Sequence, residues 1–279
     1  MEEGESLFER IGYKLVEKHI AGKTMSAAIA KALMMNEKDL LADLTFLSEV
    51  PDNRAKISYI TNTYMQLARQ MGRFGIRGAM TVPIDQLGSA ISVDVACESI
   101  EKIQRTCRHY ATFPWYQVGS NENDIKVALC LENKEDFGMA FCDSETLSKF
   151  MKKNKMRNVK LVVEAERDVK ELLGEKSAKG AGRGEIASAM SKAKGVTIMC
   201  SNDEAMKKLA KASRQDGKYT FEFEFGDSEK RWERIARKGV QISIYMPFGK
   251  DWVRYAINKV PEGHIRSFAS ELIKQKEVE

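Results

Sequence analysis

Short apolar runs separated by amphipathic stretches are the feature that most constrains the fold of this chain. Seven runs have the length and composition of buried strands, namely residues 41–47, 78–84, 126–131, 159–163, 196–200, 219–225 and 240–246. Between them, apolar residues recur at helical spacing in 57–71, 95–110, 203–213 and 228–238. Strands that alternate with helices predict βαβ units and a parallel sheet. Seven or eight such units in 279 residues favour a single closed α/β domain, a distorted TIM-like (β/α)8 barrel.

We expect one domain over residues 1–279, with 1–20 as an N-terminal helical extension. The stretch 174–195 breaks the alternation, because it contains five glycines and no good apolar run. It is interpreted either as a loop over the functional end of the barrel or as a surface insertion, and the sequence favours neither.

Charge and cysteine content exclude several classes of protein. The net charge is +5, with 45 basic residues spread among 40 acidic ones, which gives no support to nucleic-acid binding. The five cysteines form no CxxC pair and only three histidines are present, so we expect no metal site of the zinc type and a reducing, cytoplasmic location. No apolar run approaches the roughly 18 residues of a transmembrane helix, and the acidic N-terminus is unlike a signal peptide.

Polar residues follow several of the apolar runs, where a barrel places its catalytic groups. They are Asp85 and Gln86, Glu132 and Asn133, Glu164 and Glu166, and Ser201 to Asp203. Glu222 and Glu224 share one face of their strand. Directed inward they could be acid–base groups or, with Glu132, metal ligands. The alternative is that they reach solvent or pair with a lysine.

A glycine-rich segment, Lys179 to Gly184, could hold a phosphate through its backbone N–H groups. It lacks the spacing of a Walker A loop and of the GxGxxG motif, so alone it is a weak signal.

Several segments, in the same order along the chain, resemble motifs of flavin-dependent proline dehydrogenases. The stretch Gln241 to Trp252 resembles the last strand and loop of that family, which reads roughly Val-Tyr-Val-Pro-Tyr-Gly-x-Asp-Trp. Phe221 to Glu224 resembles the family's Phe-Glu-Phe-Gln strand. The remaining matches are Ile20 to Thr24 with the Ala-Gly-Glu-Thr segment, Leu41 to Glu49 with the first strand, and Gln86 to Gly88 with the end of Lys-Leu-Thr-Gln-Leu-Gly.

The resemblance implies a barrel that holds FAD at the carboxyl ends of its strands and transfers hydride from C5 of proline, giving pyrroline-5-carboxylate. It implies a small-molecule substrate and a separate electron acceptor, such as a quinone at the membrane surface. A peripheral association with a membrane is then an alternative to a purely cytoplasmic location.

Carried over position by position, the resemblance assigns cofactor contacts unevenly. Glu164 takes the place of a flavin-contacting glutamine, and Glu224 that of the glutamine in Phe-Glu-Phe-Gln. Residues 176–182 match Arg-Leu-Val-Lys-Gly-Ala-Tyr and keep Lys179, Gly180 and Ala181. Ser201 and Asn202 replace a Thr-His pair. Residues 128–132 fall on the family's Arg-Ile-Asp-Met-Glu strand and keep only Glu132.

The substrate contacts implied by the resemblance are Tyr255, Asn258, Lys259 and Glu262. The family has an arginine pair where this chain has Asn258 and Lys259, and a lysine where it has Pro83. Because arginine offers a planar fork to a carboxylate, these losses remove most of the expected carboxylate grip. No catalytic side chain is assigned. The chain is therefore interpreted as a proline dehydrogenase-like oxidoreductase or, alternatively, as a degenerate barrel with a binding or regulatory role.

Overall fold

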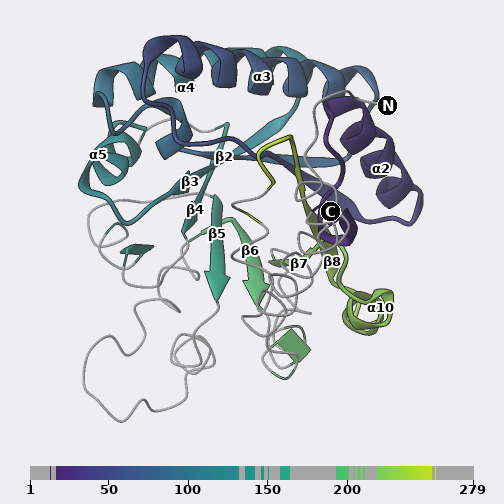
Figure 1. The fold of residues 1–279 in the computed structure, drawn as a ribbon. Coiled ribbons are helices and arrows are strands. Elements are labelled where there is room, and N and C mark those ends of the chain that lie inside the picture. Colours follow the sequence, from purple (N-terminus) through teal and green to yellow (C-terminus); the bar gives the residue numbers. More distant parts are fainter. Residues whose placement is uncertain are drawn as a thin grey trace, which may run out of the picture.

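Eight parallel strands close into a barrel in chain order, β1 to β8 (Figure 1). The computed structural model describes residues 13, 17–131, 136–141, 146–147, 150, 158–163, 193–200, 204, 206–207, 210, 219–252 and 255. The strands are β1 (Leu41–Phe46), β2 (Gly78–Pro83), β3 (Phe113–Val118), β4 (Gly138–Phe141), β5 (Asn158–Val163), β6 (Gly195–Cys200), β7 (Tyr219–Glu224) and β8 (Gln241–Phe248). The barrel closes where β8 pairs with β1 in parallel, from Ser243 opposite Leu41 to Phe248 opposite Phe46. The predicted (β/α)8 fold is confirmed.

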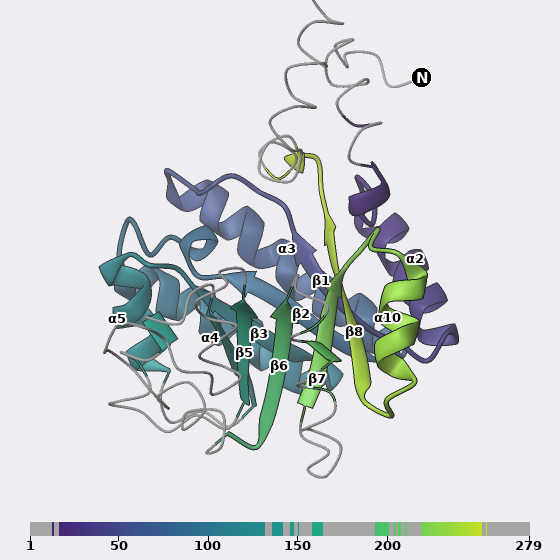
Figure 2. The same ribbon diagram turned by 90° about the horizontal axis from the view of Figure 1, so that it is seen from below.

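Helices cover the outside of this barrel. They are α2 (Met25–Glu37), α3 (Arg54–Arg73), α4 (Val93–Tyr110), α5 (Glu122–Cys130) and α10 (Glu229–Ala236), with short 3-10 helices η1 (Glu17–His19) and η2 (Asp85–Leu87). The long helices α3 and α4 lie side by side over the first strands (Figure 1). Seen from below, α10 and α2 lie beside β7 and β8 (Figure 2). The helix starts are defined by local chemistry: Asn53, for example, accepts a hydrogen bond from the N–H of Lys56 and so caps α3.

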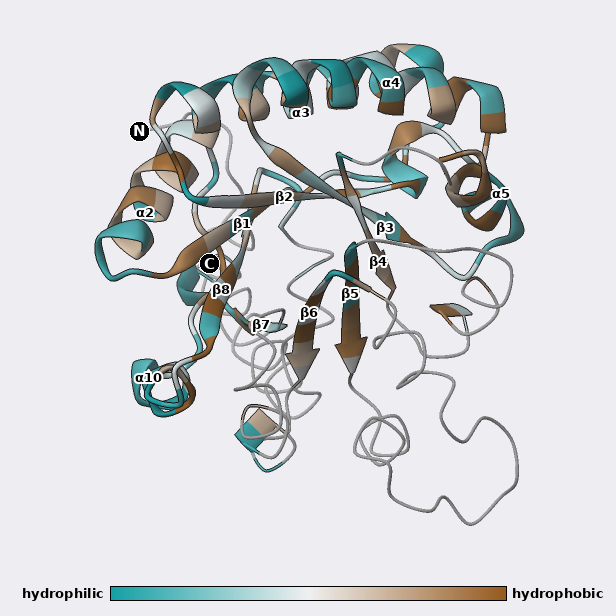
Figure 3. Cartoon of the chain, turned by 180° about the vertical axis from the view of Figure 1, so that it is seen from behind, coloured by the Kyte–Doolittle hydropathy of each residue, from teal (hydrophilic) through white to brown (hydrophobic). Residues whose placement is uncertain are grey.

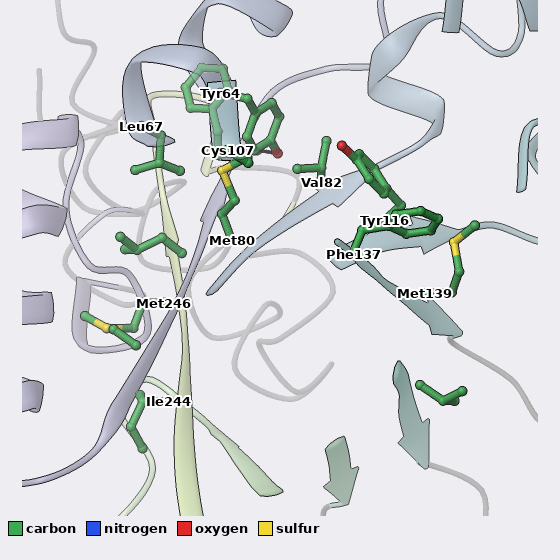
Figure 4. Close-up of a cluster of buried hydrophobic side chains, with 14 of the residues drawn as sticks. Tyr64, Leu67, Met80, Val82, Cys107, Tyr116, Phe137, Met139, Ile244 and Met246 are labelled. Carbon is green, nitrogen blue, oxygen red and sulfur yellow. Dashed lines mark hydrogen bonds between the residues drawn. The ribbon is translucent and has the colours of Figure 1, made fainter. Parts of the chain in front are cut away.

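The main hydrophobic core lies between the strands and the helices. Figure 3 shows the strands as mostly hydrophobic and the outer faces of α3 and α4 as hydrophilic. Tyr64 and Leu67 of α3 and Cys107 of α4 point toward Met80 and Val82 of β2 (Figure 4). Because side chains alternate along a strand, the residues between these core positions face the inside of the barrel.

A small apolar cluster fills part of the barrel interior separately from the main core. It contains Ala79, Trp115 and Ala140, with Phe113 packed against it. Gly138, opposite Trp115 in the β3–β4 pairing, leaves room for the indole ring, since a Cβ there would lie 2.0 Å from a ring carbon. The interior is therefore packed with side chains rather than open, as expected for an eight-stranded barrel.

The prediction of a strand at 126–131 was wrong, because this run lies in helix α5 and the turn that follows it. Asn121 accepts a hydrogen bond from the N–H of Asp124 and starts the helix. Asp124, Val127, Ala128 and Leu131 are buried at helical spacing. Two real strands were missed instead. Strand β3 contains Pro114, which weakens a strand pattern, and β4 has only four residues.

Candidate functional site

The centre of the barrel holds a buried ionic cluster, which we call the central cluster and define as Asp43, Lys160 and Glu222 with Thr81. Nζ of Lys160 lies 2.6 Å from Oδ2 of Asp43 and 2.5 Å from Oε1 of Glu222. It also donates to Oγ1 of Thr81 at 3.1 Å. The hydroxyl of Thr81 in turn donates to Asp43 at 2.9 Å. The ammonium group therefore donates hydrogen bonds to Asp43 and Thr81 and makes an ion pair with Glu222.

The strands that carry the central cluster show why these side chains meet. Asp43, Lys160 and Glu222 come from β1, β5 and β7, and the interior of such a barrel is built from layers that alternate strands supply. Each of the three side chains is at most 2% exposed. Tyr245 of β8, which is only half-buried, lies over them with its ring centroid 5.2 Å from Nζ of Lys160. The ring of Tyr245, the residue opposite Asp43 in the β1–β8 pairing, is therefore part of the immediate surroundings of the central cluster.

Burial dominates the electrostatics of the central cluster. Burial raises the pKa of Glu222 to about 8; the Lys160 ammonium opposes this rise, and the charge of Asp43 adds to it. The two carboxylates hold the pKa of Lys160 above its ordinary value, although burial alone would lower it. Burial thus favours the protonated form of Glu222, whereas the two carboxyl groups favour the charged form of Lys160.

The segment after β8 lies at the carboxyl end of the barrel. Trp252 is buried with Leu47, which directly follows β1, and Tyr255 packs against the same cluster. Burial and the nearby charge of Glu224 raise the pKa of Tyr255 well above its usual value. Tyr255 and Glu224, assigned to substrate and cofactor respectively, thus lie close enough for Glu224 to act on the tyrosine electrostatically. Tyr13 stacks edge-on against Trp252, with 5.5 Å between the ring centroids.

The side chain of Gln86, in the segment that resembles Lys-Leu-Thr-Gln-Leu-Gly, connects helix α3 to the end of β1 through hydrogen bonds. Its Oε1 accepts from the hydroxyl of Tyr64 at 3.1 Å, and its Nε2 donates to the carbonyl oxygens of Phe46 and Ser48. Gly88 follows with a φ of +89°, a conformation that favours glycine. The matching Gln-Leu-Gly residues therefore support the fold at this strand end, and Pro83 closes β2 where the family has a lysine.

Most of the predicted contact residues fall outside the described residues. These are Glu164, Lys179, Gly180, Ala181, Ser201, Asn202, Asn258, Lys259 and Glu262, together with Glu132 of the metal interpretation. Tyr255, Glu224 and Glu222 are described. Glu222 points inward and pairs with Lys160, which confirms the lysine alternative for this residue. Among the described residues, no group of three His, Cys, Asp or Glu side chains could hold a metal ion.

Sequence reasoning overlooked Asp43, Thr81 and Lys160. The sequence does contain an indication of a buried charged cluster. Asp43 and Lys160 each lie within an apolar run, with a hydrophobic residue on either side. A charged residue inside a buried strand needs a partner of opposite charge. The presence of two such strands and of Glu222 in a third would have suggested an interior ion pair.

The fold and this site define the class of protein: a (β/α)8 barrel with a filled polar centre and a half-buried polar surface at the carboxyl ends of its strands. No protein-family model matches the sequence. The chain is 19% identical to proline dehydrogenase 1 of Bacillus subtilis (strain 168) in an alignment 277 positions long. This alignment covers 87% of this chain and 85% of that protein. The sequence identity to proline dehydrogenase 1 of Bacillus subtilis subsp. natto is 18% in an alignment 275 positions long. It covers the same 87% of this chain and 85% of that protein.

Solved structures of proline utilization A (PutA) share the fold. The protein from Corynebacterium freiburgense superimposes with a TM-score of 0.65 over 94% of this chain, at 14% identity. The protein from Bdellovibrio bacteriovorus gives 0.64 over 88%, at 13% identity. This chain spans 32% of the length of either PutA chain. The chain is thus similar, at low identity, to proline dehydrogenase 1 over most of its length, and it shares its fold with the PutA structures.

A membrane-spanning helix needs a certain length and hydrophobicity. Within the described ranges, none of the helices is both long enough and apolar enough to cross a membrane.

Proposed function

We propose that this protein is a flavin-dependent oxidoreductase of the proline dehydrogenase type, acting on proline or a related cyclic amino acid. The observation that carries the proposal is the match to proline dehydrogenase 1, which runs through 87% of this chain and 85% of that enzyme. The position of Tyr255 at the carboxyl end of the barrel adds support, because enzymes of this fold place their sites there.

The packing of the interior indicates where FAD would fit. The apolar cluster around Trp115 and the central cluster occupy the interior of the barrel, so a flavin ring would have to bind at the carboxyl ends of the strands. Glu224 on β7 is half-buried on that side and is a suitable contact. We expect Glu164, Lys179, Gly180, Ala181, Ser201 and Asn202 to complete the site. FAD, when bound, would supply the hydride acceptor for C5 of the substrate.

The strand order suggests a second register for one family motif. When the family's motifs are taken in order and one strand is assigned to each, Arg-Leu-Val-Lys-Gly-Ala-Tyr falls on the fifth strand. In this chain β5 contains Lys160-Leu161-Val162, which would match Arg-Leu-Val. The position of α5 shows that the assignment of 128–131 to the strand Arg-Ile-Asp-Met-Glu was wrong, and β3 would take that place. In this second register Lys160 retains the positive charge of the motif's arginine. The match at Lys179 to Ala181 remains the first prediction, and flavin titration distinguishes the two.

The proposed substrate site has few positively charged groups to bind the carboxylate of the substrate. Pro83 offers no charge, and Lys160 is already engaged by Asp43, Thr81 and Glu222 of the central cluster. We infer that Lys259 supplies the remaining positive charge near Tyr255 and Glu262, with poorer geometry than an arginine pair would give.

The test is an absorbance spectrum of the purified protein, followed by proline-dependent reduction of a dye acceptor. The proposal expects flavin absorbance between about 350 and 500 nm, because binding of FAD keeps the chromophore with the protein. It also expects slow dye reduction that N-propargylglycine abolishes, since this compound inactivates the Bdellovibrio bacteriovorus PutA. A colourless protein that binds no added FAD would refute the cofactor and the function together.

A second candidate is a barrel that binds a ligand without catalysis. The observation that favours it is the loss of free cations: Pro83 stands where the family has a lysine, and Lys160 is neutralised inside the barrel. In this case proline or FAD would raise the melting temperature without any turnover. Bound flavin without dye reduction, on proline or on other cyclic amino acids, would favour this candidate.

A further inference from the structure

The charges of the central cluster do not balance when all three groups are ionised. Asp43 and Glu222 supply two carboxylates, whereas Lys160 supplies one ammonium group, and all three are nearly inaccessible to solvent. A net charge inside a closed barrel is costly, because burial in a medium of low dielectric constant disfavours unpaired charge. One extra proton would make the central cluster neutral.

The hydrogen bonds indicate which carboxyl group holds this proton. Asp43 accepts from both the Thr81 hydroxyl and the Lys160 ammonium group, which are the contacts that an ionised carboxylate needs. Oε1 of Glu222 lies 2.5 Å from Nζ of Lys160, but both carboxyl oxygens of Glu222 are buried without a well-formed hydrogen bond among the described residues. An oxygen in that position is better suited to carry a proton than a charge.

We propose that Asp43, Lys160 and Glu222 form a proton-binding site at the centre of the barrel, in which Glu222 holds the proton and its release leaves one net negative charge below the carboxyl ends of the strands. The raised pKa of Glu222, about 8, is consistent with this arrangement. The proton would leave to solvent past the half-buried Tyr245. Glu222 lies outside the proposed flavin and substrate contacts, and the inference does not depend on the proposed function.

The described groups that surround Glu222 are few. Lys160 on β5, Asp43 on β1 and Tyr245 on β8 come from the other elements, and Glu224 follows two residues later on its own strand. Lys160, with a raised pKa, keeps its charge throughout the range in which Glu222 titrates. The proton is therefore exchanged by the carboxyl groups alone.

Infrared spectroscopy can detect the stored proton through the C=O stretch of a protonated carboxyl group. Wild type at pH 7 should show this band, and it should disappear as the pH rises through about 8. Glu222→Gln should lack it. Glu224→Gln is the matched control, since it changes the same residue type on the same face but at a half-buried position, and it should retain the band.

The pH dependence of urea unfolding gives an independent measurement. The folded protein keeps the Glu222 proton up to a pH of about 8, whereas the unfolded chain loses it near 4.5. Between these values the unfolding equilibrium constant of wild type, relative to Glu222→Gln, should rise by up to about tenfold per pH unit and then level off. A ratio that is independent of pH, or a band that persists in Glu222→Gln, would overturn the proposal.

A second variant keeps the test decisive if Glu222→Gln does not fold. In Asp43→Asn one carboxylate faces one ammonium group, so the charges balance without an extra proton. The infrared band should then be absent at pH 7. Its persistence in Asp43→Asn, with wild-type intensity, would show that charge balance does not control the proton.

Discussion

Nζ of Lys160 on β5 lies 2.6 Å from Oδ2 of Asp43 on β1, although these strands are on opposite sides of the barrel and share no pairing. The lysine side chain therefore spans the interior, and its charge is satisfied by residues far away in sequence. This contact, together with Glu222, links three strands that the backbone hydrogen bonds do not link to one another directly.

Removing the cation of the central cluster should destabilise the fold strongly. Lys160→Met keeps much of the side-chain length but leaves Asp43 buried without a counterion, so we expect a loss of about 3–5 kcal/mol in the free energy of unfolding. Adding Asp43→Asn and Glu222→Gln should recover much of this loss, since the triple variant has no buried charge. Urea denaturation measures both effects. Lys126→Met, which breaks an exposed pair with Glu122, is the control and should cost less than about 1 kcal/mol. A similar small loss for Lys160→Met would contradict the burial argument.

Gln86 should matter for stability, because its amide connects the ends of β1 and β2. Gln86→Ala removes one of two acceptors of the Tyr64 hydroxyl, the other being the carbonyl oxygen of Phe46, and it removes the donor to Ser48. We therefore expect a loss of about 1–3 kcal/mol in the free energy of unfolding. The exposed Gln66 on α3 is a matched position, and Gln66→Ala should change stability by no more than about 0.5 kcal/mol. If both substitutions were equally mild, Gln86 would instead be free to contact a ligand.

The flavin contact predicted at Lys179 can be tested by titration. If the Lys-Gly-Ala segment lies against FAD, Lys179→Ala should weaken binding by about tenfold or more, because a charge-assisted hydrogen bond contributes about 1.5–3 kcal/mol. Lys170→Ala, which lies outside the matched segment 176–182, is the control and should bind FAD as wild type does. Unchanged affinity in Lys179→Ala would favour the register in which the motif falls on β5.

Restoring the arginine pair should improve turnover of proline. Asn258→Arg combined with Lys259→Arg would return two planar donors to the proposed carboxylate contact, and we expect at least about a tenfold gain in kcat/KM. The assay is proline-dependent reduction of a dye by protein with bound flavin. Rapid turnover of proline by the wild type at micromolar concentration would show that the missing arginines are unimportant. Inactivity of both proteins with flavin present would point to another substrate.

The sequence predicts the barrel well where periodicity is clear. The runs at 78–84 and 240–246 became β2 and β8, and the helical spacing of 57–71 and 95–110 became the cores of α3 and α4. The pattern fails for 126–131, since an apolar run of six residues fits a strand and a buried helix equally well. In that case the helix cap at Asn121, rather than hydrophobicity, decided the structure.

The central cluster could not be predicted in full from sequence for a different reason. Whether Glu222 pointed inward depended on the register of eight strands, and its partner on β5 is 62 positions away in the chain. A lysine amid apolar residues indicates a buried charge, but only closure of the barrel brings it to Asp43. Tyr255 could be placed near the strand ends from the Tyr245 to Trp252 match, because the length of the intervening loop leaves little freedom.

The crossing of the barrel by Lys160 has a consequence for how the two halves of the chain recognise each other. The half that contains β1 to β4 supplies Asp43 and Thr81, and the half that contains β5 to β8 supplies Lys160 and Glu222. Prepared as separate polypeptides, the first would present an unmatched anion and the second a cation beside a protonated acid. The first half would then select the second over another copy of itself, because a barrel built from two first halves would enclose two Asp43 carboxylates and no cation.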